Sequence, residues 1–220
     1  MGLIYPVIYD LLYNHFGPQG WWPAESKEEI VIGAILTQNT SWQNVEKALN
    51  NIRQNGKISL EFIHKTPRAE LAKFIRSTGY FNQKSERLKL FVEFLYHEFN
   101  GKLDDLFSLD TYILRERLLS LKGIGFETAD DIILYAAEKP VFVIDAYTKR
   151  VLSRHLLCDA GIDYNELQVI IQKETPCDVN IYMEYHALFV KVGKDFCLRK
   201  KPLCYNCPLN KLDKNIGHTG

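Results

Sequence analysis

Apolar positions recur along this chain with the period of an α-helix. The segment 41–56 is typical, because Trp42, Val45, Leu49 and Ile52 lie three or four residues apart and share one helical face. The same pattern predicts helices over these segments: 28–38, 41–56, 59–66, 67–79, 83–101, 109–123, 126–139, the second part of 141–155, 163–174 and 179–196.

Residues that begin and end helices lie at the edges of these segments. Ser41 and Asp110 are suited to N-cap positions, and Gly56 and Gly79 to helix ends. The one strand-like run, 141–144, has no partner of similar strength. The pattern therefore predicts an all-α fold with short turns.

Composition narrows the class of protein. The 220 residues suffice for one domain or two small lobes, and 27 basic against 27 acidic residues give a net charge of zero. Zero net charge argues against coating nucleic acid by bulk charge but allows a local basic face. No basic start with a long apolar core and no run of about 18 apolar residues is present, so we expect a cytoplasmic protein without a membrane segment.

The cysteines are unevenly distributed. Of the five, Cys197, Cys204 and Cys207 fall within eleven residues, while Cys158 and Cys177 stand apart. An odd count in a cytoplasmic protein argues against a disulfide framework, and the clustering indicates a metal or cluster site.

Two glycines separate the helices expected over 109–123 and 126–139. A turn this tight needs positive φ at Gly123, Gly125 or both, and leaves the first amides of the second helix unpaired. Without Cβ atoms there, a phosphate can approach the backbone and the helix dipole. A plain helix–helix turn is the alternative.

The segment "LKGIGFETADDIILYAAEKPVFVIDAYTKRVLSRH" resembles the helix-hairpin-helix motif, with its following loop and Asp, of the endonuclease III superfamily of DNA glycosylases. The resemblance extends from about Trp21 to Asp213, and "WWP" with "ILTQNT" is most similar to the 3-methyladenine DNA glycosylase III branch. It implies a two-lobed helical fold. Residues 25–137 would form a central lobe with the hairpin, and residues 1–24 with 138–220 a second lobe with the Asp and the Cys-rich loop.

The resemblance implies that Asp145 is the catalytic carboxylate, lying between the lobes. A carboxylate stabilises the positive charge that develops on deoxyribose as the base leaves, and it can orient the attacking water. From the residues alone, Asp145 equally suits an N-cap of the helix that follows. Both roles are compatible.

Glu127 occupies the position at which strand-cutting relatives carry a Schiff-base lysine. A carboxylate cannot form an imine, so we predict a monofunctional glycosylase with weak or absent lyase activity. The expected DNA contacts are Lys122, Gly123, Ile124 and Gly125 of the hairpin, together with Gln38 and Asn39. Helix capping by Asn39 and Thr40 is the alternative to a DNA contact by Gln38 and Asn39.

An extruded base needs aromatic walls, and Trp21, Trp22 and Trp42 are the candidates. An indole face also attracts a cationic, methylated purine. Ordinary core packing is the alternative for all three.

The C-terminal loop reads Cys-x6-Cys-x2-Cys-x5-Asp, where the family's iron–sulfur loop ends in Cys. The resemblance implies a 4Fe–4S cluster on Cys197, Cys204 and Cys207, with Asp213 or an outside ligand in fourth place. A labile or three-iron cluster, no cluster, and zinc are the alternatives. The glycosidic chemistry itself needs no cofactor.

The expected function is hydrolysis of the N-glycosidic bond of a damaged, alkylated base in double-stranded DNA, which the protein would bind as a monomer. One alternative is a bifunctional glycosylase and lyase acting on oxidised pyrimidines. The other is a DNA-structure-binding protein without catalysis.

Overall fold

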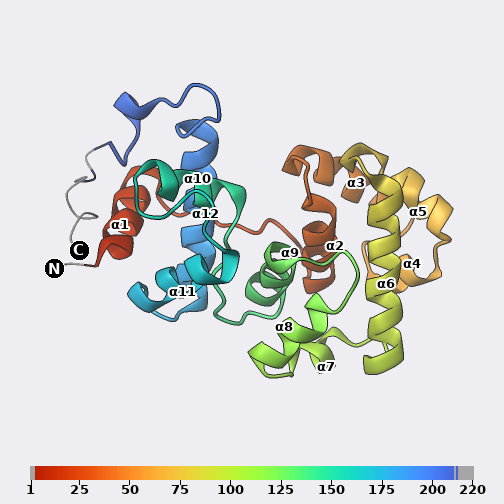
Figure 1. The fold of residues 1–220 in the computed structure, drawn as a ribbon. Coiled ribbons are helices and arrows are strands. Elements are labelled where there is room, and N and C mark those ends of the chain that lie inside the picture. Colours follow the sequence, from red (N-terminus) through yellow and green to blue (C-terminus); the bar gives the residue numbers. More distant parts are fainter. Residues whose placement is uncertain (1–2, 211, 213–220) are drawn as a thin grey trace. The chain divides into compact units, whose positions relative to one another are not determined.

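A computed structural model describes residues 3–210 and 212 of the chain. Every regular element within these residues is helical, which confirms the all-α prediction (Figure 1). Contacts between residues divide the chain into two units, residues 24–139 and residues 1–23 with 140–220. We call them the hairpin unit and the acid unit. In the described part of the chain, no helix is long and apolar enough to cross a membrane.

The hairpin unit, residues 24–139, is built around the apolar helix α2 (Lys27–Thr37). Its other elements are α3 (Trp42–Asn55), α4 (Leu60–Lys65), α5 (Arg68–Phe74), the 3-10 turn η1 (Arg76–Thr78), α6 (Phe81–Phe99), α7 (Leu103–Phe107), α8 (Thr111–Leu119), α9 (Phe126–Asp131) and the π-helical turn η2 (Ile132–Ala136). Helix α2 packs against α3, α6 and η2. Residues 31–36 are all buried, as expected for a helix that is apolar all round.

The acid unit is built on α12 (Val179–Asp195), which packs against α1 (Ile4–Phe16) and α10 (Ala146–Arg154). Helix α11 (Tyr164–Glu174) packs against α1, and the short turn η3 (Cys204–Asn206) lies in the cysteine loop. The rings of Tyr182 and Tyr185 both lie 5.4 Å from that of Phe142, edge to face. These aromatic contacts form part of the core of the acid unit, in the segments that carry Asp145 and His186.

The strand-like run 141–144 remains extended without pairing into a strand. Side chains of α11 supply the missing backbone partners: Gln172 accepts from the Phe142 amide at 2.8 Å, and Gln168 donates to the Phe142 carbonyl at 2.7 Å. Tyr164 accepts from the Ile144 amide at 3.2 Å. Because buried backbone groups need partners, these contacts stabilise the extended segment that leads to Asp145.

Several boundaries differ from expectation. The pattern missed α1, although Tyr5, Ile8 and Leu12 are buried along one face, and it missed α7. The segment 67–79 is split, because α5 ends at Phe74 and η1 follows. Asp110 caps α8 as predicted, whereas the side chain of Ser41 makes no cap hydrogen bond.

Candidate functional site

The two hairpin glycines differ in conformation. Gly123 has φ +88°, the left-handed region that glycine favours, while Gly125 is extended at φ −96° and ψ −179°. A Cβ on Gly123 would lie 2.4 Å from Nε of Arg87, whereas a Cβ on Gly125 would meet nothing within 4 Å. Only Gly123 therefore satisfies the predicted need for positive φ, and open space lies before Gly125.

Gln38 joins the end of α2 to the hairpin. Its side-chain amide nitrogen donates to the Gly123 carbonyl at 3.0 Å and to the Thr128 hydroxyl at 2.8 Å. Its amide oxygen accepts from the guanidinium of Arg87 on α6. The nitrogen and the oxygen of the Gln38 side-chain amide are thus both hydrogen-bonded, so in this structure Gln38 stabilises the hairpin.

Arg87 is a site residue that the sequence reading missed. It lies half-buried beneath Gly123 and carries a cation to the hairpin turn. The signal for it was weak, since one arginine in a long amphipathic helix ordinarily faces solvent. Its position depends on α6 lying beside α2.

The other predicted contacts of the hairpin have different surroundings. Lys122 is exposed and forms an ion pair with Glu86 at 3.1 Å. The Ile124 side chain is buried, and its amide donates to the Leu121 carbonyl at 3.0 Å. Asn39 is exposed in the left-handed region, at φ +54°.

The amides of Gly123 and Gly125 donate to no other residue within the described part of the chain. Both glycines are exposed, and α9 runs on without a break into η2. Backbone donors at the start of a continuous helix favour an anion. Glu127 lies exposed in the first turn of α9, a position that a carboxylate favours through the helix dipole.

Asp145 caps α10. Its Oδ1 accepts from the Thr148 amide at 2.6 Å, and the side chain is buried at the end of the extended segment 141–144. The predicted N-cap geometry is therefore present. This bond fixes the direction of the carboxylate.

The second oxygen of Asp145 lies near His186, a residue that the sequence reading did not single out. Oδ2 is 3.8 Å from Nε2 of His186, which is buried on α12. Burial raises the pKa of the Asp145 carboxyl, but His186 and the Thr148 amide together outweigh burial and hold this pKa below its usual value. The carboxylate is thus ionised at neutral pH.

The three tryptophans are half-buried and divide between the units. Trp21 and Trp22 lie in the acid unit with ring centroids 5.3 Å apart and planes tilted by 47°. Trp42 begins α3 of the hairpin unit. The rings of Trp21 and Trp22 are thus neighbours on one short segment.

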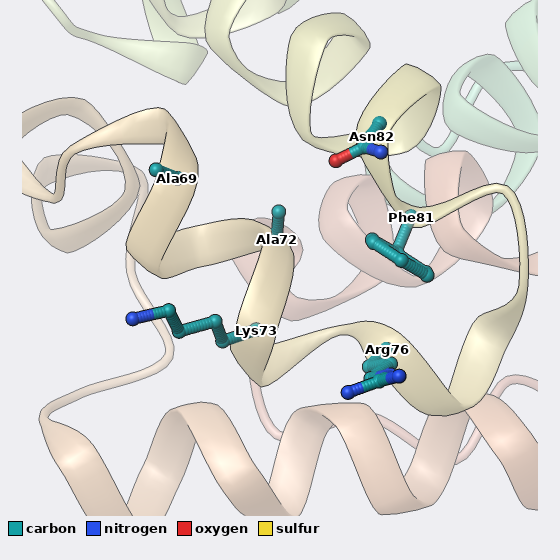
Figure 2. Close-up of a pocket in the computed structure, with 6 residues that line it drawn as sticks. All are labelled: Ala69, Ala72, Lys73, Arg76, Phe81 and Asn82. Carbon is teal, nitrogen blue, oxygen red and sulfur yellow. The ribbon is translucent and has the colours of Figure 1, made fainter.

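A cavity of about 190 Å³ opens on the hairpin unit between α5, η1 and the start of α6 (Figure 2). Lys73 and Arg76 bring cations to it, and the guanidinium of Arg76 lies 5.8 Å from the ring centroid of Phe81. None of the side chains predicted for the site lines this cavity.

The cysteine loop is held by arginines of α10. Arg150 donates to the Cys197 carbonyl at 2.8 Å, and Arg154 donates to the Cys197 sulfur at 3.3 Å. Cys197 and Cys207 are buried, while Cys204 is exposed. Burial raises the pKa of the Cys207 thiol; the Leu209 amide opposes this, and the neighbouring cysteines add to it.

The described residues contain only part of the expected cluster site. Within residues 3–210 and 212, no three Cys, His, Asp or Glu side chains converge to hold a metal ion. The expected fourth ligand, Asp213, lies outside the described residues. The iron–sulfur cluster stays a prediction.

The sequence of the chain is similar to those of known DNA repair proteins. Residues 32–177 match the HhH-GPD superfamily of base excision DNA repair proteins. A protein of Methanocaldococcus jannaschii that is named, by inference, a DNA repair glycosylase is 45% identical over 206 residues, or 93% of each chain.

Two solved structures extend the comparison. The H. pylori 3-methyladenine DNA glycosylase bound to 1,N6-ethenoadenine is 29% identical, with a TM-score of 0.73 over 86% of this chain and 96% of that one. Endonuclease III in a non-covalent complex with DNA shares the fold, with a TM-score of 0.80 at 21% identity over 94% and 92%. With its sequence, its helices and its hairpin in agreement, the chain belongs to the HhH-GPD superfamily of base excision DNA repair proteins.

Proposed function

We propose that this protein is a monofunctional DNA glycosylase that hydrolyses the N-glycosidic bond of an alkylated base in duplex DNA. The observation that carries the proposal is the buried Asp145 carboxylate, which is held by the Thr148 amide and lies near His186. Membership of the base excision repair superfamily supports the class of reaction.

The chemistry assigned to Asp145 is electrostatic. As the bond between C1′ and the base nitrogen breaks, the bonding electrons leave with the base and positive charge develops on the sugar. An ionised, fixed carboxylate stabilises that charge without reorganising. Water then adds to C1′ and loses one proton to solvent, and a cationic methylated purine leaves as the neutral base without taking up a proton. The lowered pKa of Asp145 suits this role, because the group stays ionised throughout.

The absence of lyase chemistry is inferred from Glu127. A carboxylate at this position in the first turn of α9 cannot attack the sugar to form an imine. The product would then be an intact strand with an abasic site, cleaved only by later alkali treatment.

The assignment of an alkylated base rests on two observations. The H. pylori glycosylase that resembles this chain acts, by its name, on 3-methyladenine. The neighbouring indoles of Trp21 and Trp22 could stack on an extruded base, and a cationic methylated purine gains from an electron-rich ring face.

DNA binding is assigned to the hairpin. The amides of Gly123 and Gly125 would donate to a backbone phosphate, with Arg87 and Lys122 as nearby cations. Phosphate contacts of this kind hold the duplex without reading its sequence.

The test is a base-release assay on labelled duplexes that each carry one methylated purine, deaminated base, mismatch or oxidised pyrimidine. Each reaction is divided and analysed with and without alkali, beside Asp145→Asn and Asp163→Asn. Asp163 is a matched control, because it caps α11 through the amides of Asn165 and Glu166 and is exposed.

The expected result is cleavage only after alkali, strongest with the methylated purine, lost in Asp145→Asn and kept in Asp163→Asn. Strand cuts without alkali would show a lyase and contradict the reading of Glu127. Binding without base release from any duplex would favour a non-catalytic DNA-binding protein.

A further inference from the structure

Lys84 on α6 is a buried amine inside the hairpin unit. Its side chain is 1% exposed, and Nζ donates to two backbone carbonyls, that of Leu36 at 2.9 Å and that of Thr78 at 2.8 Å. A buried lysine is costly unless its donors are used. Both of these hydrogen bonds go to the main chain, so Lys84 fixes the position of the backbone at these two carbonyls.

Both carbonyls lie at helix ends. Leu36 is the penultimate residue of α2, and Thr78 is the last residue of η1. The Thr40 amide donates to Thr37, so it does not continue the helical ladder to Leu36. Carbonyl ends of helices carry partial negative charge and lack intrahelical donors. Lys84 supplies the donor to two helix ends at once.

An exposed turn follows each of these carbonyls. Gln38 and Asn39 come after α2, and Gly79 and Tyr80 come after η1. Asn39 and Tyr80 both adopt the left-handed region, at φ +54° and +43°. Residues other than glycine persist there when the surrounding structure fixes them. The bonds from Lys84 fix the backbone three residues before Asn39 and two residues before Tyr80.

Lys84 and Arg87 are one turn apart on α6, so both face α2. Lys84 holds the main chain just before Gln38, and Arg87 donates to the side chain of Gln38. Gln38 in turn donates to Gly123 and Thr128. A chain of contacts thus leads from the buried amine to the Gly123 carbonyl.

We propose that Lys84 is a positioning residue of the hairpin interface: by holding the end of α2 it directs the Gln38 amide onto Gly123 and Thr128. Its consequence for DNA binding rests on the proposed function. Its consequence for the Gln38 contact does not.

The same helix offers a matched control. Lys89 donates to the carbonyls of Ile63 and His64, at 3.0 and 2.6 Å, near the end of α4. It therefore makes the same kind of contact with a helix that carries no residue of the hairpin site. Burial lowers the pKa of both lysines.

The test compares Lys84→Met, Lys89→Met, Gln38→Ala and the double variant Lys84→Met/Gln38→Ala. Fluorescence anisotropy gives the affinity for a duplex with a tetrahydrofuran abasic-site analogue, well below each variant's Tm. NMR follows the side-chain amide signal of Gln38 in 15N-labelled protein. Lys84→Gln, which keeps a donor, replaces Lys84→Met if the latter does not fold.

We expect Lys84→Met to weaken binding about tenfold, as when a buried hydrogen-bond pair is broken, and to shift the Gln38 amide signal. Lys89→Met should lower Tm but change neither the affinity for DNA nor the Gln38 amide signal. In the Gln38→Ala background, Lys84→Met should weaken binding no further, because the two residues act through one contact.

An unchanged Gln38 signal, equal losses of affinity in Lys84→Met and Lys89→Met, or additive losses in the double variant would overturn the proposal. If wild-type protein binds no duplex, the proposed function fails. The Gln38 signal then still decides the role of Lys84.

Discussion

Oδ2 of Asp145 lies 3.8 Å from Nε2 of His186, and both side chains are buried within the acid unit. One group caps α10 and the other comes from the middle of α12, so the packing of these two helices creates the pair. His186 and the cap bond to Thr148 together keep the carboxylate ionised where burial alone would favour its neutral form.

This pair predicts how stability depends on pH. Because the pKa of Asp145 is lower in the folded than in the unfolded chain, the carboxylate contributes stability above the unfolded value of about 3.9. That contribution is lost as pH falls through the lower, folded pKa. In urea unfolding from pH 2 to 6, the free energy of unfolding should fall more steeply with decreasing pH for wild type than for Asp145→Asn. Parallel curves for the two proteins would contradict the prediction.

The hairpin glycines predict two different outcomes. Gly123→Ala should lower the free energy of unfolding by about 1–3 kcal/mol, because it combines a left-handed φ with a clash against Arg87. Gly125→Ala should stay within about 0.5 kcal/mol of wild type, since its new Cβ meets open space. Chemical denaturation measures both.

For Gly125→Ala the expected defect is in DNA binding, because the methyl group would occupy the space before the backbone amide. Anisotropy should show weaker binding of duplex with an unchanged Tm. Wild-type affinity in this variant would mean that no phosphate approaches Gly125.

Glu127→Lys should create lyase activity. A lysine there would restore the amine that strand-cutting relatives carry, so incubation with substrate and borohydride should trap a protein–DNA adduct. Wild-type protein should trap none. Glu116→Lys makes the same charge change at an exposed position of α8 and serves as control. Equal trapping in the two variants would attribute the adduct to added charge alone.

The cysteine loop predicts bound iron in protein purified without air. This protein should show visible absorbance near the iron–sulfur band and should contain iron and sulfide. The absorbance and the iron and sulfide content should all fall in Cys204→Ser, which changes an exposed thiol. Zinc in place of iron would favour a zinc site. Colourless protein without metal would refute the cluster.

Local sequence determined most of the helices and some of the caps at their ends. The hydrophobic period placed α3, α6, α8 and α12, because a helix buries one face with a repeat visible in the sequence. Asp110 was recognisable as a cap, and the hairpin as a turn between helices, since both depend on neighbouring residues.

Tertiary packing decided what the site contains. His186 meets Asp145 across 41 positions of sequence and Arg87 reaches Gly123 across 36, and no local pattern encodes either contact. Packing also gave the run 141–144 its partners on α11 and turned Ile124 inward. Hydrogen bonds and burial between distant segments form only when helices pack, so a single sequence contains their residues without their pairing.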